Sequence, residues 1–241
     1  MGLGTSVHIK ILRGEGIECE NELKRILEQQ GHSCEYWELP RLLQDPEHYL
    51  NRLNKGDWVF LPGGFSFADH LGSGRLLAFE LNEIKFFDKV FLKEANLWGI
   101  CNGFQVLVAA GLFGDVELKH NEFPGRPSIF EDKWVKLYSP TLREEYFYPA
   151  RHGEGCLKLN RPAPNTECFI RYLDSWTNGS DDNTAGLIRK VGKSTVIGLM
   201  PHGEILSRPE QNPDYSFTDS IPSHFKKTSQ GIFKILEGEQ P

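Results

Sequence analysis

A cysteine with glycine two residues before it and two residues after it is the first candidate for chemistry in this chain. Residues 97–100 are apolar and lead into Cys101, and a helical pattern follows over residues 104–112. On such a strand-to-helix turn the backbone is tight and strained, and small neighbours let a substrate approach. The dipole at the start of the helix also favours the thiolate. The sequence therefore predicts a nucleophile at Cys101, with a buried structural cysteine as the alternative.

A nucleophilic cysteine needs a base, and His202 is the histidine best placed to supply one. Residues 196–200 form an apolar strand pattern, and residues 201–204 (PHGE) follow directly. Alternate residues of an extended segment face the same way, so the Glu204 carboxylate can orient the His202 ring. Active sites in parallel sheets form where the strands end, and Cys101 and His202 both follow strands. A surface histidine beside a surface glutamate is the alternative.

Two backbone positions are expected to donate hydrogen bonds to a developing negative charge. Pro62-Gly63-Gly64 follows another apolar strand, residues 57–61. A chain segment without side chains can turn its N–H groups toward an anion. The N–H of Asn102, at the start of the helix, is the second donor. We therefore expect Gly64 and Asn102 to form an oxyanion hole, although paired glycines also make plain tight turns.

The surrounding pattern indicates an α/β fold with a mostly parallel central sheet and helices on both faces. Strand and helix patterns alternate through the first half of the chain. The predicted strands are residues 7–12, 32–39, 57–61 and 97–100, and the predicted helices are residues 18–30, 42–53, 74–94 and 104–112.

The second half of the chain has a different pattern. Short β-rich runs predict antiparallel additions to the same sheet at residues 134–138, 145–149, 168–173, 185–190 and 195–200. Residues 209–222 are expected to form a loop and residues 225–236 a closing helix. Because no linker-like segment intervenes, residues 1–241 are predicted to form a single domain.

Composition narrows the functional classes. The formal net charge is -6 and no basic patch stands out, which argues against nucleic-acid binding. No apolar run approaches the roughly 20 residues of a membrane helix. The five cysteines have no CxxC spacing, so neither a disulfide framework nor a metal site is expected. Reduced thiols fit a cytoplasmic protein.

Two glycine-rich segments are weak candidates for a nucleotide site. Residues 14–16 (GEG) follow the first strand, but Cys19 occupies the place of the third glycine that a dinucleotide loop requires. Residues 192–194 (GKS) lie in a strand–turn–strand pattern, whereas a phosphate loop needs strand–loop–helix. We therefore expect no cofactor in this chain.

Together these segments resemble the class I (triad) glutamine amidotransferases, and most closely the glutaminase subunits of phosphoribosylformylglycinamidine synthase in purine biosynthesis. Residues 99–105 match the class motif G-x-C-x-G-x-Q, and residues 62–69 (PGGFSFAD) are similar to the family's PGGFSYGD. Residues 13–20 resemble its first-strand loop, and residues 152–155 match its HGEG. An N…F…W segment is also similar, at Asn121, Phe130 and Trp134. The resemblance covers most of the chain and implies a flavodoxin-like sheet.

The resemblance implies a role for each candidate residue. Cys101 attacks the side-chain amide of L-glutamine to form a γ-glutamyl thioester, while His202 transfers protons and Glu204 orients it. The backbone amides of Gly64 and Asn102 hold the oxyanion. The glutamine is expected to contact three more residues, which are Gly63, Phe65 and Gln105.

The resemblance also implies a partner. The family delivers ammonia to a large synthase chain, and the complex can include a small bridging subunit. The synthase uses ATP to convert formylglycinamide ribonucleotide to the amidine, so ATP and magnesium are expected on the partner. Because free ammonia would be lost to protonation and diffusion, the two proteins need a sealed route between them.

The sequence departs from the family at two places. Gly203 replaces the usual proline of His-Pro-Glu, which is expected to weaken the preorganisation of His202. Residues 71–74 (LGSG) lack an arginine found in many bacterial members. His152 and Glu154 lie in a turn that we expect to contact the synthase or to be purely structural.

The sequence alone leaves two other functions open. One is a stand-alone cysteine hydrolase on the same fold, acting on peptides or γ-glutamyl compounds. The other is a module that binds glutamine or a partner without turnover.

Overall fold

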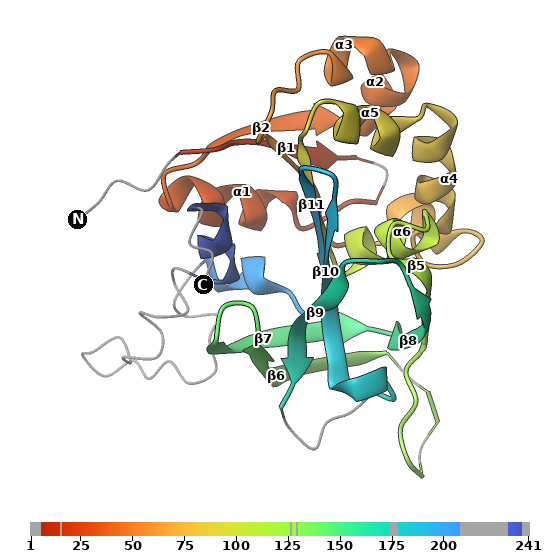
Figure 1. The fold of residues 1–241 in the computed structure, drawn as a ribbon. Helices are drawn as coiled ribbons and strands as arrows, with labels where there is room; N and C mark the ends of the chain where they lie inside the picture. The colour runs from red at the N-terminus through yellow and green to blue at the C-terminus, as the bar shows by residue number, and fades with distance from the viewer. Residues whose placement is uncertain are drawn as a thin grey trace.

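A nine-stranded sheet forms the centre of the computed structural model, with strand order β2-β1-β3-β4-β11-β10-β9-β6-β7 (Figure 1). The structure describes residues 6–14, 16–125, 127–128, 130–173, 178–207 and 231–237. The strands of this sheet are β1 (His8–Arg13), β2 (Ser33–Glu38), β3 (Trp58–Leu61), β4 (Asn96–Ile100), β6 (Glu131–Ser139), β7 (Glu144–His152), β9 (Thr166–Tyr172), β10 (Thr184–Val191) and β11 (Ser194–Leu199).

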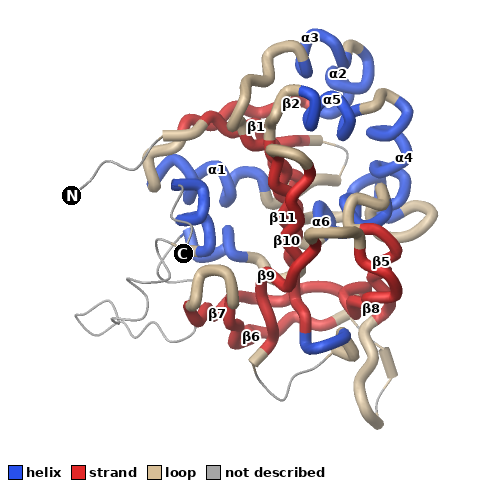
Figure 2. The backbone as a smooth tube through the Cα atoms, in the orientation of Figure 1, coloured by secondary structure: helices blue, strands red, loops and turns tan. Residues whose placement is uncertain are grey.

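The strands β2, β1, β3, β4 and β11 run parallel to one another and make up the parallel half of the sheet. Every residue of β3, β4 and β11 is buried, because helices cover both faces of this half. Figure 2 shows α1 on one side of the strands and α4, α5 and α6 on the other. The predicted mostly parallel α/β fold is confirmed.

The helices are α1 (Glu20–Gln29), α2 (Leu39–Gln44), α3 (Pro46–Leu50), α4 (Arg75–Glu83), α5 (Phe86–Leu92) and α6 (Asn102–Ala109). Two predicted long helices are each broken into two. Asp45 lies between α2 and α3, and α3 begins at Pro46, which has no N–H to continue the preceding helix. Lys85, with φ +54°, separates α4 from α5. No described helix is long and apolar enough to cross a bilayer.

The strands β10, β9, β6 and β7 pair antiparallel and form the antiparallel half of the sheet. The predicted antiparallel additions are therefore confirmed for residues 134–138, 145–149, 168–173 and 185–190, whereas the run at 195–200 is β11, which pairs parallel with β4 and antiparallel with β10. The sequence did not predict β5 (Gly114–His120) and β8 (Glu154–Pro162), which pair in a separate two-stranded sheet. Most residues of β5 are not buried, so the strand has little of the apolar alternation by which strands are recognised.

The described C-terminal segment packs into the core beside the parallel half. Residues Ile232–Glu237 form a 3-10 helix, η5, where an α-helix was predicted; residues 209–222 and 225–230 lie outside the described residues. Phe233 is buried against the rings of Trp98 and Phe60. The N–H of Ile232 donates to the hydroxyl of Tyr148 on β7. This segment therefore ties the two halves of the sheet together.

Candidate active site

Cys101 lies on the sharp turn between β4 and α6. Its backbone has φ +50° and ψ −107°, a strained conformation typical of a nucleophile elbow. The two flanking glycines make this turn possible, because a Cβ on Gly103 would lie 1.8 Å from the carbonyl oxygen of Leu61 and one on Gly99 would lie 2.5 Å from that of Gly103. The thiol is 5% exposed and donates to the carbonyl oxygen of Arg151 at 3.5 Å.

His202 lies at the same edge of the sheet as Cys101. Strands β4 and β11 are parallel neighbours, with Ile100 paired to Leu199, so the residues that follow the two strands emerge together. The N–H of His202 donates to the carbonyl oxygen of Pro149 at 2.8 Å, which fixes the backbone that carries the ring.

Glu204 contacts His202 as the sequence predicts, but by a different local structure. The imidazole Nδ1 lies 2.7 Å from Glu204 Oε1, and the ionised carboxylate can only accept, so Nδ1–H donates. The expected extended segment is wrong, because Gly203–Ser207 forms a 3-10 helix, η3. The two side chains therefore meet across one helical turn. His202 is 4% exposed and Glu204 is 0% exposed.

The surroundings of His202 favour its charged form. Burial disfavours the imidazolium, but the Glu204 carboxylate and the Cys101 sulfur, which also hydrogen-bonds the ring, outweigh it. Together they hold the pKa of His202 well above its usual value. The imidazole thus interacts with a sulfur and a carboxylate at once. This arrangement suits proton exchange between the sulfur and the imidazole.

The loop that carries Gly63 and Gly64 is pinned to the loop after β1. Gly64 has φ +140°, and a Cβ there would lie 2.3 Å from the carbonyl oxygen of Gly16. The N–H of Phe65 donates to the same carbonyl oxygen. Gly63 lies against the imidazole, where a Cβ would lie 2.6 Å from His202 Cε1. Glycine is therefore required at both positions for the loop to approach its neighbours this closely.

Asn102 joins this loop to α6. Its side-chain oxygen accepts from the N–H of Ser66, and its Nδ2 donates to both Asp69 Oδ1 and Gln105 Oε1, each contact at 3.0 Å. The Gln105 amide in turn donates to the carbonyl oxygen of Glu154 at 2.7 Å. The side chains of Asn102 and Gln105 therefore hold the walls of the site in place.

Cys101 opens into a small cavity of about 180 Å³. The residues that line this cavity include Gly64, Phe65, Cys101, Gln105, Arg151 and Glu154. Gly64, Phe65 and Gln105 thus line the same cavity as Cys101. Gly63 does not line the cavity and lies behind it, against His202.

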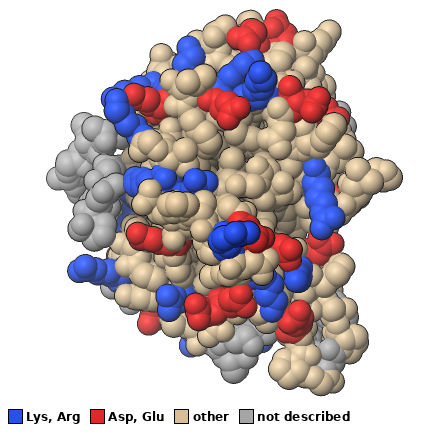
Figure 3. Space-filling model, turned by 45° about the vertical axis from the view of Figure 1, so that its right-hand side comes forward, with Lys and Arg blue, Asp and Glu red and all other residues tan. Residues whose placement is uncertain are grey.

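On the molecular face drawn in Figure 3, acidic and basic side chains are mixed and no broad basic field is visible.

The segment from Arg151 to Glu154 covers the site, and the sequence reasoning gave it no chemistry. Its carbonyl oxygens accept from Cys101 and from Gln105. His152 within it is fully buried, and burial, with the nearby charge of His202, lowers the pKa of His152 to about 3. The motif HGEG was the available signal, but its position over the cavity depends on the pairing of β6 and β7, which the sequence does not specify.

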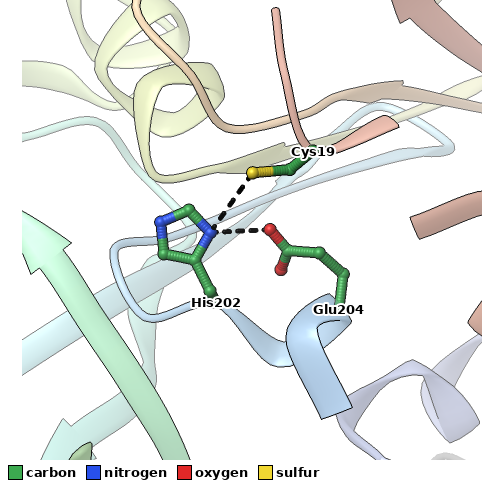
Figure 4. A group of neighbouring side chains, drawn as sticks. All are labelled: Cys19, His202 and Glu204. Atoms are coloured by element: carbon green, nitrogen blue, oxygen red, sulfur yellow. Dashed lines mark hydrogen bonds and ion pairs between the residues drawn. The ribbon is translucent and has the colours of Figure 1, made fainter. Parts of the chain in front are cut away.

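Cys19 is a second residue that the sequence reasoning missed. Its Sγ lies 3.9 Å from His202 Nδ1, on the side of Glu204 (Figure 4). The segment after the first strand was considered as a nucleotide loop and as a match to the family's first-strand loop, and Cys19 was given no role in either. The rule that loops after parallel strands gather at one edge was the available signal, since Cys19 follows β1.

Comparison with known proteins defines the class. The sequence profile of the CobB/CobQ-like glutamine amidotransferase domain matches residues 6–235, and this chain belongs to that family. The phosphoribosylformylglycinamidine synthase subunit PurQ of Picrophilus torridus is 29% identical over 255 residues, which cover 94% of this chain and 96% of the relative. The predicted membership of the glutamine amidotransferases is confirmed.

Solved structures share the fold. A structure of PurLQS from Thermotoga maritima superposes with a TM-score of 0.70 at 24% identity, over 96% of this chain and 100% of that chain. Another glutamine amidotransferase from Thermotoga maritima superposes with a TM-score of 0.52 at 18% identity, over 97% of this chain and 94% of that chain.

Proposed function

We propose that this chain is the glutaminase subunit of a phosphoribosylformylglycinamidine synthase. The observation that carries the proposal is the near full-length similarity to one chain of that enzyme, in a protein where a strained cysteine, a buried histidine and a buried glutamate lie at one sheet edge. The chain hydrolyses L-glutamine and supplies ammonia for the amidination of formylglycinamide ribonucleotide. A stand-alone hydrolase is not favoured, because the similarity to this subunit extends over nearly all of both sequences.

In the first half-reaction the thiol of Cys101 transfers its proton to His202, and Sγ attacks the amide carbon of glutamine. The bond from sulfur to carbon forms as the amide oxygen becomes an oxyanion, which the N–H groups of Gly64 and Asn102 accommodate. His202 then returns the proton to the leaving nitrogen, and the C–N bond breaks. Ammonia and a γ-glutamyl thioester result, with Glu204 orienting the imidazole throughout.

In the second half-reaction water attacks the thioester carbon. His202 takes a proton from the water, the bond between carbon and sulfur breaks, and glutamate leaves while Cys101 recovers its proton. Both steps need the imidazole between the sulfur and the carboxylate. The buried contacts of His202 with Glu204 and Pro149 hold it there.

The cavity beside Cys101 suits the side chain and α-carbon of one amino acid. We propose that Phe65 contacts the substrate directly, while Gln105 shapes the wall, since both ends of its amide are held by Asn102 and Glu154. Gly63 serves the site by letting the loop pass the His202 ring.

The thioester chemistry needs no cofactor on this chain. We propose that ATP and magnesium act on a large synthase chain, which receives the ammonia, and that the complex can include a small bridging subunit. The five cysteines are free thiols, which fits a cytoplasmic location.

The proposal is tested by measuring glutamate release from L-glutamine for the chain alone and with its synthase partner. Cys101→Ser is expected to lower the rate by at least about 10³-fold in both settings. Cys168→Ser, a cysteine on β9, is the matched control and is expected to retain activity. An equal fall in both variants, or full activity of Cys101→Ser, would contradict the proposal. Activity with the partner is expected to exceed activity alone, whereas a stand-alone hydrolase needs no partner.

A further inference from the structure

Three side chains of the site form a compact donor cluster that the glutaminase mechanism uses only in part. The Cys19 sulfur, the His202 ring and the Glu204 carboxylate each offer an atom, and these atoms all lie within 4.8 Å of one another. Figure 4 shows Cys19 and Glu204 approaching the same ring nitrogen from two elements far apart in the sequence. The mechanism gives the Cys19 thiol no step.

We propose that Cys19, His202 and Glu204 form an inhibitory binding site for a soft divalent cation of the Zn²⁺ class. The effect on activity rests on the proposed glutaminase function, but the site itself does not. A thiolate sulfur, an imidazole nitrogen and a carboxylate oxygen are all donors that Zn²⁺ accepts, and a mixed set of three leaves one position for water.

Two of the three donor separations are near those that a zinc ion requires, and the third, between the Cys19 sulfur and the Glu204 carboxylate, is within 4.8 Å. Bonds of about 2.3 Å to sulfur and about 2.0 to 2.2 Å to nitrogen and oxygen place tetrahedral ligand atoms about 3.4 to 3.6 Å apart. The contact of 2.7 Å between Nδ1 and Oε1 must lengthen by about 0.7 Å, and the separation of 3.9 Å between Sγ and Nδ1 must shorten by about 0.3 Å. Side-chain rotations can supply movements of this size.

The carboxylate has capacity for a second contact. Glu204 Oε2 is buried and has no hydrogen-bond partner within the described part of the chain, while Oε1 faces His202. A buried carboxylate oxygen without a partner is costly, and a cation nearby would relieve that cost.

The sulfur is held in place, and a cation can reach it. The N–H of Cys19 donates to the carbonyl oxygen of Gly63, and α1 begins at the next residue. A Cβ on Gly63 would lie 3.4 Å from the sulfur and 3.3 Å from His202 Nδ1, so the absence of a side chain lets the two donors come together. Cys19 is only partly buried, whereas His202 and Glu204 are buried, so the cation would enter from its side.

Binding would remove the acid and base of the reaction. The Cys19 thiol proton leaves to solvent as the sulfur bonds the cation, and the single proton of the neutral ring moves from Nδ1 to Nε2 as Nδ1 becomes a ligand. That nitrogen can then no longer accept the Cys101 proton, and the leaving ammonia loses its imidazolium donor. Glutamine hydrolysis therefore stops while Cys101 remains unmodified.

Binding is tested first without any activity measurement, with Co²⁺ as the spectroscopic probe and the full chain. We expect one thiolate-to-cobalt charge-transfer band per chain, retained in Cys101→Ser and Cys168→Ser and lost in Cys19→Ser. A band that is lost in Cys101→Ser and kept in Cys19→Ser would place the ion on the other ring nitrogen and overturn the proposal. The absence of a band in the unsubstituted chain would overturn it as well.

A second measurement needs no variant. Peptide mapping after alkylation is expected to show that Zn²⁺ protects Cys19 at least about tenfold while Cys168 reacts as before. Equal labelling of Cys19 with and without Zn²⁺ would overturn the proposal.

The inhibitory effect is then measured as the ratio of glutaminase rates with and without Zn²⁺. The concentration that halves the rate is expected to rise at least about tenfold in Cys19→Ser, because one of three ligands is lost. An unchanged concentration would overturn the inhibitory role. If glutamine is not hydrolysed at all, the proposed function fails, while the cobalt band still decides the site.

Discussion

The two halves of the sheet contribute to the site in different ways. In the parallel half, β4 and β11 end in line and deliver Cys101 and His202 to one edge. In the antiparallel half, β7 ends over that edge with the carbonyl oxygen of Arg151, and the chain continues directly to that of Glu154 at the start of β8. Cys101 and His202 therefore lie at the ends of buried strands, while the segment that closes the cavity follows a strand of the more exposed half.

The same contrast separates the two buried histidines. His202, from the parallel half, has the Glu204 carboxylate at 2.7 Å, and its pKa is raised. His152, from the antiparallel half, is buried near the charge of His202, and its pKa is lowered to about 3. Burial lowers the pKa of an imidazole, and a carboxylate partner raises it. Only the first arrangement suits proton transfer to and from sulfur.

The largest loss of glutaminase activity should come from replacing one of these two histidines and not the other. His202→Asn is expected to lower glutaminase activity about 10³-fold, because proton transfer is lost. His152→Gln is expected to lower it less than about tenfold, since that ring is not placed to exchange protons. Steady-state rates of the two variants, each first checked for folding by circular dichroism, would decide the matter. Comparable losses would remove the distinction between the two histidines.

The next largest effect should be a difference in stability between glycine substitutions in the two halves, because the two sites are packed differently. Gly103→Ala places a Cβ 1.8 Å from the Leu61 carbonyl oxygen, and we expect it to lower the free energy of unfolding by more than about 4 kcal/mol or to prevent folding. Gly153→Ala is the matched variant in the segment that covers the site, where the nearest atom would be 3.8 Å away. It is expected to change stability by less than about 1 kcal/mol. Denaturant unfolding measures both, and a stable Gly103→Ala would contradict the tight elbow.

The pH dependence of stability tests the neutral state of His152. Its pKa is lower when folded than when unfolded, so below about pH 6.5 the unfolded chain gains a proton that the folded chain does not. Stability is therefore lost as the pH falls from 6.5 toward 3, with a cost of about 2 kcal/mol at pH 5. The free energy of unfolding is measured at pH 8 and pH 5 for the unsubstituted chain and for His152→Gln. The change in their difference between the two pH values gives the contribution of His152, because the other titrating groups are present in both chains. A difference that does not change with pH would show that His152 is protonated in the fold.

The smallest change in the free energy of unfolding is expected for a substitution at Gly203, where the two halves meet. A Cβ there would lie 3.3 Å from Ile232 Cγ2 and 3.4 Å from Tyr148 Cε2, so packing from the C-terminal segment and from β7 already restrains this turn. Gly203→Pro, at the first position of η3, is expected to raise the free energy of unfolding by about 0.4 to 1 kcal/mol. Destabilisation by thermal or urea unfolding would show that Ile232 cannot move aside.

The sequence predicted the parallel half well and the antiparallel half less well. Residues 97–105 specify a strand, an elbow and a helix by local pattern alone, so Cys101 could be placed in advance. The cover over the cavity depends on long-range pairing of β6 with β7, and Cys19 meets His202 across 183 positions. Neither leaves a local pattern. The break at Pro46 could have been predicted from the proline itself, whereas Lys85 is an ordinary helix residue and gives no such signal. The assignment of residues 1–241 to one domain stays a prediction.

The most direct test of the account is to label the chain with a diazo ketone analogue of glutamine and locate the adduct by mass spectrometry. If Cys101 is the nucleophile that His202 activates, the label attaches to Cys101, L-glutamine protects it, and His202→Asn slows the labelling at least about 10²-fold. Labelling of Cys101 no faster than of Cys168, or labelling that glutamine does not prevent, would contradict the account.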